Sequence, residues 1–149
     1  MIFNKAIGDY DFVLQSKNRN SFILFNFLEL DRVHHSSVNY LVSIKDDKFS
    51  GEINVWIDTD VLKNFIRDLI EANINRTGNF NLYSLSPEEM EIKFMSQRVG
   101  RFEIAYSIKR IGYTENLFIE TTLKGSLEFD IEFFYPLEEK LKEINKLLK

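Results

Sequence analysis

The stretch FSGEINVWIDTDVLKNFIRDLIE, residues 49–71, decides the fold class because its hydrophobic periodicity changes once, near the middle. Up to Ile57 apolar and polar residues alternate, which is typical of a β-strand with one buried face. From Val61 the apolar residues recur at helical spacing, so an amphipathic helix follows. Asp58 or Thr59 stands at the junction, and both residue types cap helix N-termini. The stretch therefore predicts a strand that runs directly into a helix.

The sequence on either side predicts mostly strands. A second helix is expected to begin at Pro136, with an apolar stripe that includes Leu141 and Ile144. Alternating segments predict strands at Tyr10–Gln15, Ser21–Leu30, Tyr40–Lys45, Phe49–Ile57, Phe80–Leu85, Met90–Met95, Phe102–Arg110, Leu117–Leu123 and Leu127–Phe134. Short gaps favour antiparallel neighbours, including a five-stranded meander after the first helix. We expect an α+β fold, a largely antiparallel β-sheet of about eight or nine strands with one central and one C-terminal helix packed on it.

The last two predicted strands define a candidate binding surface. If Lys124-Gly125-Ser126 is a three-residue turn, the apolar residues of both strands share one face and the acidic residues share the other. The acidic face would carry Glu120, Glu128, Asp130 and Glu132, with Glu120 directly opposite Asp130. Opposed like charges destabilise a sheet, so such a face suggests a binding surface. The alternative is an ordinary solvated face on which Arg101 or Lys109 neutralises the acids.

Length and composition indicate a single cytoplasmic domain over residues 1–149. The chain is 44% hydrophobic and 14% aromatic, enough to form a real core, and it has no cysteine for disulfides or thiolate metal sites. Asp9 and Asp11 interrupt the N-terminal segment, which argues against a signal peptide, and no apolar run is long enough to span a bilayer. The formal net charge of −4 argues against general binding to the nucleic-acid backbone.

Residues that could carry chemistry are few. His34 and His35 are the only histidines, and in a strand their side chains would diverge, so neither a metal site nor a catalytic triad with Ser36 is favoured. We expect one of them to pack or hydrogen-bond in the core. Glycine-rich phosphate loops and nucleophile elbows are absent from the sequence. A weak candidate for a nucleic-acid contact consists of Gln97, Arg98, Arg101 and Phe102.

Several segments carry a resemblance to a known family. They are the stretch Arg32-Val33-His34-His35, the strand that starts Phe49-Ser50-Gly51, the helix pattern Asp60-x-Leu62-x-x-Phe65-x-x-x-Leu69, and the closing strand and helix from Phe129 to Leu148. In these features the chain resembles the WapI-type immunity proteins of bacterial polymorphic toxin systems. The resemblance implies a protein that binds the C-terminal domain of a cognate toxin, often a nuclease, and blocks it. We expect no cofactor.

Charge suggests how such binding would work. Because a nuclease must attract phosphate, an acidic surface on its inhibitor would steer association and mimic the phosphate charge. The candidate contact residues are Glu120, Glu128, Asp130 and Glu132, with Asp31, Asp46 and Asp47 as a second acidic edge. Two alternatives stay open. They are a small-molecule-binding β-rich domain with a Phe-lined cavity, and a hydrolase that uses paired carboxylates.

Overall fold

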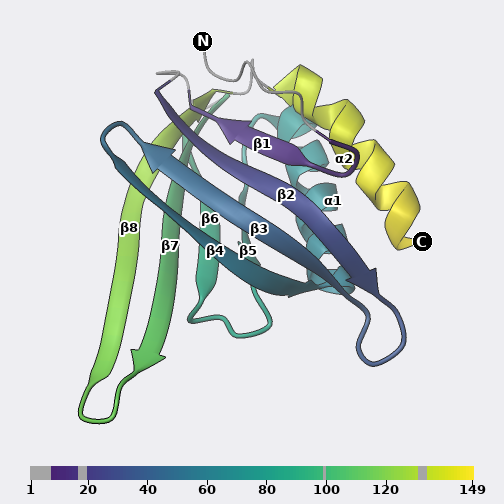
Figure 1. Ribbon diagram of the computed structural model, residues 1–149. Coiled ribbons are helices and arrows are strands. Elements are labelled where there is room, and N and C mark those ends of the chain that lie inside the picture. The colour runs from purple at the N-terminus through teal and green to yellow at the C-terminus, as the bar shows by residue number, and fades with distance from the viewer. Residues whose placement is uncertain (1–7, 17–19, 99, 131–133) are drawn as a thin grey trace.

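The computed structural model describes residues 8–16, 20–98, 100–130 and 134–149, and within them the strands form two antiparallel four-stranded sheets (Figure 1). The first sheet contains β1 (Phe12–Gln15), β2 (Ser21–Asp31), β3 (Ser37–Asp46) and β4 (Phe49–Asp58), in that spatial order. The helix α1 (Thr59–Asn75) follows it in the chain. The second sheet contains β5 (Asn79–Tyr83), β6 (Met90–Arg98), β7 (Arg101–Tyr113) and β8 (Phe118–Asp130), and α2 (Phe134–Leu148) ends the fold. The α+β class with a central and a C-terminal helix is confirmed.

The end of the chain differs from the sequence-based expectation: α2 begins at Phe134 rather than at Pro136, and residues 131–133 of the predicted strand Leu127–Phe134 lie outside the described residues. The predicted turn at Lys124-Gly125-Ser126 is wrong, because residues 118–130 form a single continuous strand paired with β7. The meander after α1 therefore has four strands rather than five. Gly125 lies in the middle of β8 opposite Tyr106, where a Cβ atom would lie 2.5 Å from the Tyr106 hydroxyl oxygen. The glycine makes room for a tyrosine ring and does not mark a turn.

The first sheet buries the face that its alternating sequence predicts. The rings of Phe12 and Phe25 stack at a centroid distance of 4.3 Å, and Tyr40 meets both of them edge-on. The Tyr40 hydroxyl is not orphaned, because it donates a hydrogen bond of 2.9 Å to the carbonyl of Tyr10. Burial raises the pKa of Tyr40, so this hydroxyl stays protonated and remains a donor.

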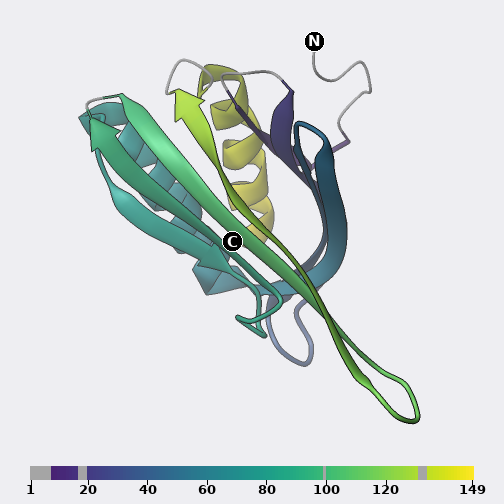
Figure 2. The same cartoon turned by 90° about the vertical axis from the view of Figure 1, so that its left-hand side faces the viewer.

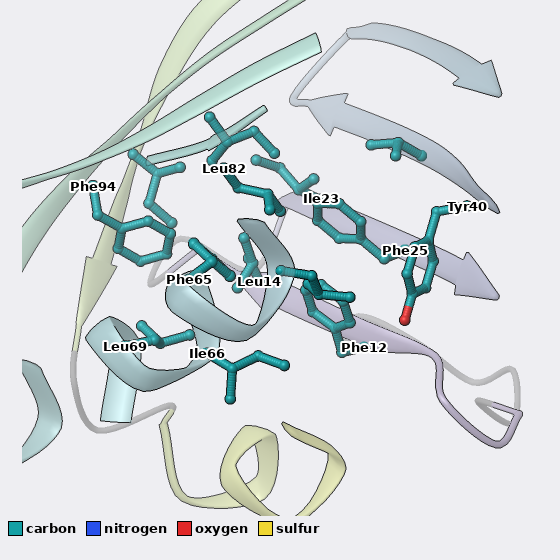
Figure 3. Packing of buried hydrophobic residues seen from close by; sticks show 14 of the residues in the cluster. Phe12, Leu14, Ile23, Phe25, Tyr40, Phe65, Ile66, Leu69, Leu82 and Phe94 are labelled. Atoms are coloured by element: carbon teal, nitrogen blue, oxygen red, sulfur yellow. The ribbon is translucent and has the colours of Figure 1, made fainter. Parts of the chain in front are cut away.

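The helix α1 connects the cores of the two sheets. Its N-cap is Asp58, one of the two predicted capping residues, whose carboxylate accepts hydrogen bonds from the N–H groups of Asp60 and Val61. On its buried face, Phe65 packs against Phe80 and Phe94 of the second sheet at centroid distances of 5.8 and 5.7 Å. Figure 3 shows Phe65, Ile66 and Leu69 between side chains of both sheets. The molecule therefore has one continuous core.

The two sheets approach each other where β4 passes β7. Gly51 of β4 allows this approach, because a Cβ atom there would lie 3.2 Å from Leu123 and 3.3 Å from Ile108. A polar contact also joins the sheets, since the Tyr106 hydroxyl donates a 2.7 Å hydrogen bond to Asp46. Beyond this junction the β7–β8 hairpin continues outward, away from the rest of the molecule (Figure 2). The fold therefore consists of a packed body and a projecting ribbon.

Candidate functional site

At the end of the β7–β8 hairpin, most of the large apolar side chains are exposed to solvent. Figures 1 and 2 both show this end extending past the sheets and helices. Every side chain from Tyr113 to Thr122 is exposed. The exposed apolar residues, which we call the apolar tip, are Ile111, Tyr113, Leu117, Phe118 and Ile119. Tyr113 is 79% exposed and Phe118 is 57% exposed, whereas the Phe residues of the body are mostly buried.

Local interactions explain why the ribbon keeps its shape without support from the body. Thr114 closes the turn, because its N–H donates to the carbonyl of Leu117 at 2.8 Å and its hydroxyl oxygen accepts from the Leu117 N–H at 3.0 Å. The next pair across the strands, Tyr113 and Phe118, has its rings edge-to-face at 5.4 Å. Such a pair contributes about 0.5–1.5 kcal/mol beyond its buried area. The tip is thus an ordered hairpin rather than a loose loop.

The apolar tip is presented on both faces of the ribbon. Residues paired across two strands share a face, and successive residues alternate. The pairing of Tyr113 with Phe118 puts them on one face together with Ile111 and Glu120, whereas Ile119 lies on the other face. A cluster of exposed apolar residues of this kind commonly marks a surface that contacts another molecule. Tyr and Phe are also enriched at the centres of protein interfaces.

The two described acids of the predicted patch each lie near a cation on β7. Lys109 Nζ lies 2.7 Å from Glu120 Oε1, and the hydrogen bond to this carboxylate raises the pKa of Lys109. Arg101 Nη1 lies 4.0 Å from Glu128 Oε1. These two contacts agree with the alternative interpretation from the sequence. On this exposed sheet face, Lys109 balances the charge of Glu120 and Arg101 balances that of Glu128.

The other predicted contact residues do not join these two. Glu120 and Asp130 do not oppose each other, because they are ten residues apart on one strand, or roughly 33 Å at about 3.3 Å per residue. Only the backbone of Asp130 is described, and Glu132 lies outside the described residues. The predicted acidic face is therefore spread along β8 instead of being concentrated on a short hairpin.

The predicted second acidic edge does not form either. Asp31 is the last residue of β2 and pairs with Ser37 at the start of β3, whereas Asp46 is at the far end of β3, where the β3–β4 hairpin closes. Asp46 accepts hydrogen bonds from Ser21 and Tyr106, so it holds the body together. Asp47 is exposed in the β3–β4 turn with a left-handed backbone, φ 55°.

The two histidines lie in the loop between β2 and β3 and not in a strand. The expectation that one of them packs in the core is wrong, because the side chains of His34 and His35 are 86% and 58% exposed. His35 Nε2 lies 2.8 Å from Asp58, the N-cap of α1, and His34 Nδ1 lies 3.3 Å from Asp31. Arg32 in the same loop donates a 3.1 Å hydrogen bond to the Lys149 carbonyl oxygen. This loop therefore links the first sheet to both helices.

Other candidate sites find little support. Within the residues that the structure describes, no group of three or more His, Asp or Glu side chains could hold a metal ion. The proposed nucleic-acid contact loses its aromatic platform, because Phe102 is buried in the core at 1% exposure. Gln97, Arg98 and Arg101 line an open depression together with Glu128. Neither described helix has the length and apolar composition of a membrane span.

The fold and its projecting hairpin define the chain as an α+β protein with two meander sheets and an exposed apolar tip. Comparison of the chain with protein-family models, with curated proteins and with solved structures finds no match.

The apolar tip was not among the residues singled out from the sequence. The segment Tyr113-Thr114-Glu115-Asn116-Leu117-Phe118 does contain a signal, because two aromatic residues flank a short polar turn. The sequence pattern does not reveal that this turn lies beyond the body, where none of the described helices and strands covers it.

Proposed function

We propose that this chain is a protein-binding domain of the immunity type, which neutralises a cognate toxin domain by direct contact through the β7–β8 hairpin. The observation that carries the proposal is the apolar tip, held by an ordered turn outside the packed body. Five large apolar side chains gather there: Ile111, Tyr113, Leu117, Phe118 and Ile119. The resemblance to WapI-type immunity proteins supplies the class of partner.

A rigid aromatic hairpin suits inhibition by insertion. Tyr and Phe bury a large area with few rotatable bonds, so they lose little conformational entropy on binding. A narrow two-stranded ribbon fits a concave surface such as a substrate cleft. Insertion of Tyr113 and Phe118 would exclude water from the partner surface and block access to it.

The acids keep a secondary role in this proposal. Glu120 shares a face with Tyr113 and Phe118, so it would lie at the rim of the contact. Rim charges mainly affect the rate of association and its dependence on salt. Glu128 is farther along the same face, next to Arg101. We therefore place the aromatic residues at the centre of the contact and the acids around it.

Two observations support the proposal of protein binding over the alternatives from the sequence. A small-molecule site would need a Phe-lined cavity, whereas three depressions formed by described residues are open to solvent and lined by charged, polar and apolar side chains together. The most buried described carboxylate, Asp11, accepts hydrogen bonds from Asn26, Phe27 and Gly8. It therefore holds β1 to β2, which is a structural role.

The test is calorimetric titration of the chain against the toxin-like C-terminal domain encoded beside it. We expect one-to-one binding below micromolar, and we expect Tyr113→Ser combined with Phe118→Ser to weaken it at least about 100-fold, as for hot-spot residues. Phe49→Ser is the matched control, because Phe49 is also exposed, at 70%, but lies on a different hairpin. Equal loss of binding in the Phe49 variant, or normal binding by the double variant, would refute the assignment of the tip.

A further inference from the structure

From Phe118 to Ser126, the outer edge of β8 is an exposed strand edge that no described strand pairs with. β8 is the last strand of the second sheet, and in the described part of the chain no strand pairs with its outer side (Figure 1). Its side chains from Phe118 to Thr122 are all exposed, as are Lys124 and Ser126. An exposed edge strand can pair with a strand of another molecule.

The hydrogen-bond pattern identifies which residues of β8 face outward. The Thr114 N–H donates to the Leu117 carbonyl, so Thr114 and Leu117 form a hydrogen-bonded pair. In an antiparallel pair of strands, hydrogen-bonded pairs alternate with pairs whose N–H and C=O groups point away from the partner strand. On β8 the odd-numbered residues are therefore bonded to β7. The even-numbered residues of β8 therefore direct their N–H and C=O groups away from β7. The carbonyl of Glu128 confirms this direction, because it accepts a 3.1 Å hydrogen bond from the Ser16 hydroxyl on the outer side.

The outward-facing residues form a sequence that is complementary to itself. They are Phe118, Glu120, Thr122, Lys124 and Ser126. We propose that a second copy of this chain pairs antiparallel along this edge, with the two-fold axis at Thr122, so that the two second sheets become one continuous sheet. In this register Glu120 lies opposite Lys124 of the partner subunit, and the same pair recurs on the other side of the axis.

Charge selects this register over its neighbours. Centring the axis on Glu120 would oppose two glutamates, and centring it on Lys124 would oppose two lysines. Opposite charges directly across two strands stabilise the pairing, and like charges destabilise it. Centring it on Thr122 instead places Thr122 against its own copy, a pair that suits a sheet.

The surrounding side chains fit the same register. Phe118 would lie opposite Ser126 of the partner subunit and Ile119 opposite Gly125 of the partner subunit, so large residues meet small ones. Lys109 of β7 pairs with Thr122 of β8. The Lys109 side chain is therefore a diagonal neighbour of both Glu120 and Lys124 of β8. Its present 2.7 Å contact with Glu120 can therefore persist while that glutamate also meets Lys124 of the partner subunit.

The test uses the purified full chain alone, without any toxin domain, so its outcome is independent of the proposed function. Analytical ultracentrifugation over a concentration series should show a monomer–dimer equilibrium. Glu120→Lys and Lys124→Glu, each made alone, should weaken dimerisation about tenfold, because each change creates repulsion at both symmetry-related pairs. The two changes combined restore opposite charges and should return the dimer to within about threefold of wild type.

A backbone variant tests the edge itself. Thr122→Pro removes an outward-facing N–H and leaves the β7–β8 hydrogen bonds intact, so the monomer should fold, as its circular dichroism would verify, and the dimer should be lost. Thr122→Val keeps the N–H and should still dimerise.

Three results would overturn the proposal. They are a monomer at every concentration, a dimer that persists in folded Thr122→Pro, and a charge-swapped double variant no better than the single variants. A dimer that is lost in Tyr113→Ser but kept in Thr122→Pro would place the contact at the apolar tip instead.

Discussion

At the scale of single residues, Gly125 has a packing role that governs how the two sheets meet. A Cβ atom at this position would lie 2.5 Å from the Tyr106 hydroxyl oxygen and 2.9 Å from the ring carbon that bears it. The same hydroxyl donates to Asp46 across the junction between the sheets. Burial and this hydrogen bond raise the pKa of Tyr106, so the hydroxyl remains a donor at ordinary pH.

We therefore predict that Gly125→Ala destabilises the protein by about 1–3 kcal/mol, as overpacking does in well-packed sites. The alanine displaces Tyr106 and strains its bond to Asp46. Urea unfolding measures the change, and the same substitution in a Tyr106→Phe background should cost less, because the nearest atom is gone. Equal costs in the two backgrounds would show that the hydroxyl does not limit the space at Gly125.

Asp31, at the end of β2, makes a contribution to folding stability that depends on pH. The backbone N–H groups of Val33 and His34 hydrogen-bond its carboxylate and hold its pKa below the ordinary value of 3.8. Because the folded pKa is lower, the contribution to stability is complete above the unfolded pKa. It is lost as pH falls through the folded pKa.

We predict that wild type is more stable than Asp31→Asn at neutral pH and that this difference shrinks as pH falls below about 4. Urea unfolding at a series of pH values measures it. Asp47→Asn corrects for the loss of one negative charge, since Asp47 is an exposed acid in the β3–β4 turn. A difference that stays constant down to the acid end of the series would contradict the assignment.

The residues also show where sequence reasoning succeeds and fails. Asp58 was predictable as a helix cap because a cap depends on neighbours in the sequence, namely the N–H groups of Asp60 and Val61. Gly125 was mistaken for a turn residue because its actual reason, the ring of Tyr106, comes from another strand. Local causes can be inferred from the sequence, whereas a contact between distant segments cannot.

At the scale of elements, the projecting end of the β7–β8 hairpin is held by its own turn and by the Tyr113–Phe118 pair, whereas the rest of both strands packs in the core. We predict that Tyr113→Ser lowers the free energy of unfolding by no more than about 1.5 kcal/mol, the upper end of what such an aromatic pair contributes. It should at the same time speed amide hydrogen exchange around the Thr114–Leu117 turn. Urea unfolding and hydrogen exchange test the two halves, and a loss of several kcal/mol would show that the tip belongs to the cooperative core.

The elements themselves were largely predictable. The strands and both helices follow from hydrophobic period and capping signals, because those depend on which face of each element is buried. The error lies in β8, which was divided at Gly125, and that error moved Glu120 next to Asp130 in the expected site. The acidic site was therefore constructed from a wrong register, although its Glu120 shares a face with the aromatic residues of the apolar tip.

At the scale of the whole molecule, a packed body carries one exposed ribbon. The α+β class was predictable, but the division into two four-stranded sheets and the projection of one hairpin were not. Those features depend on how far each strand extends past its neighbours and on the approach of β4 to β7. The proposed partner binding and the proposed pairing of β8 both arise from this projection.

The most direct test of the central claim is amide hydrogen exchange of the chain with and without the proposed partner, a toxin-like domain sought among the chains encoded beside it. The account predicts that slowed exchange on binding centres on the hairpin end, from Ile111 to Ile119, while the loop that carries His34 and His35 and the β3–β4 turn are unchanged. Protection centred on the loop, on the turn or on the helices, with the hairpin end unaffected, would contradict it.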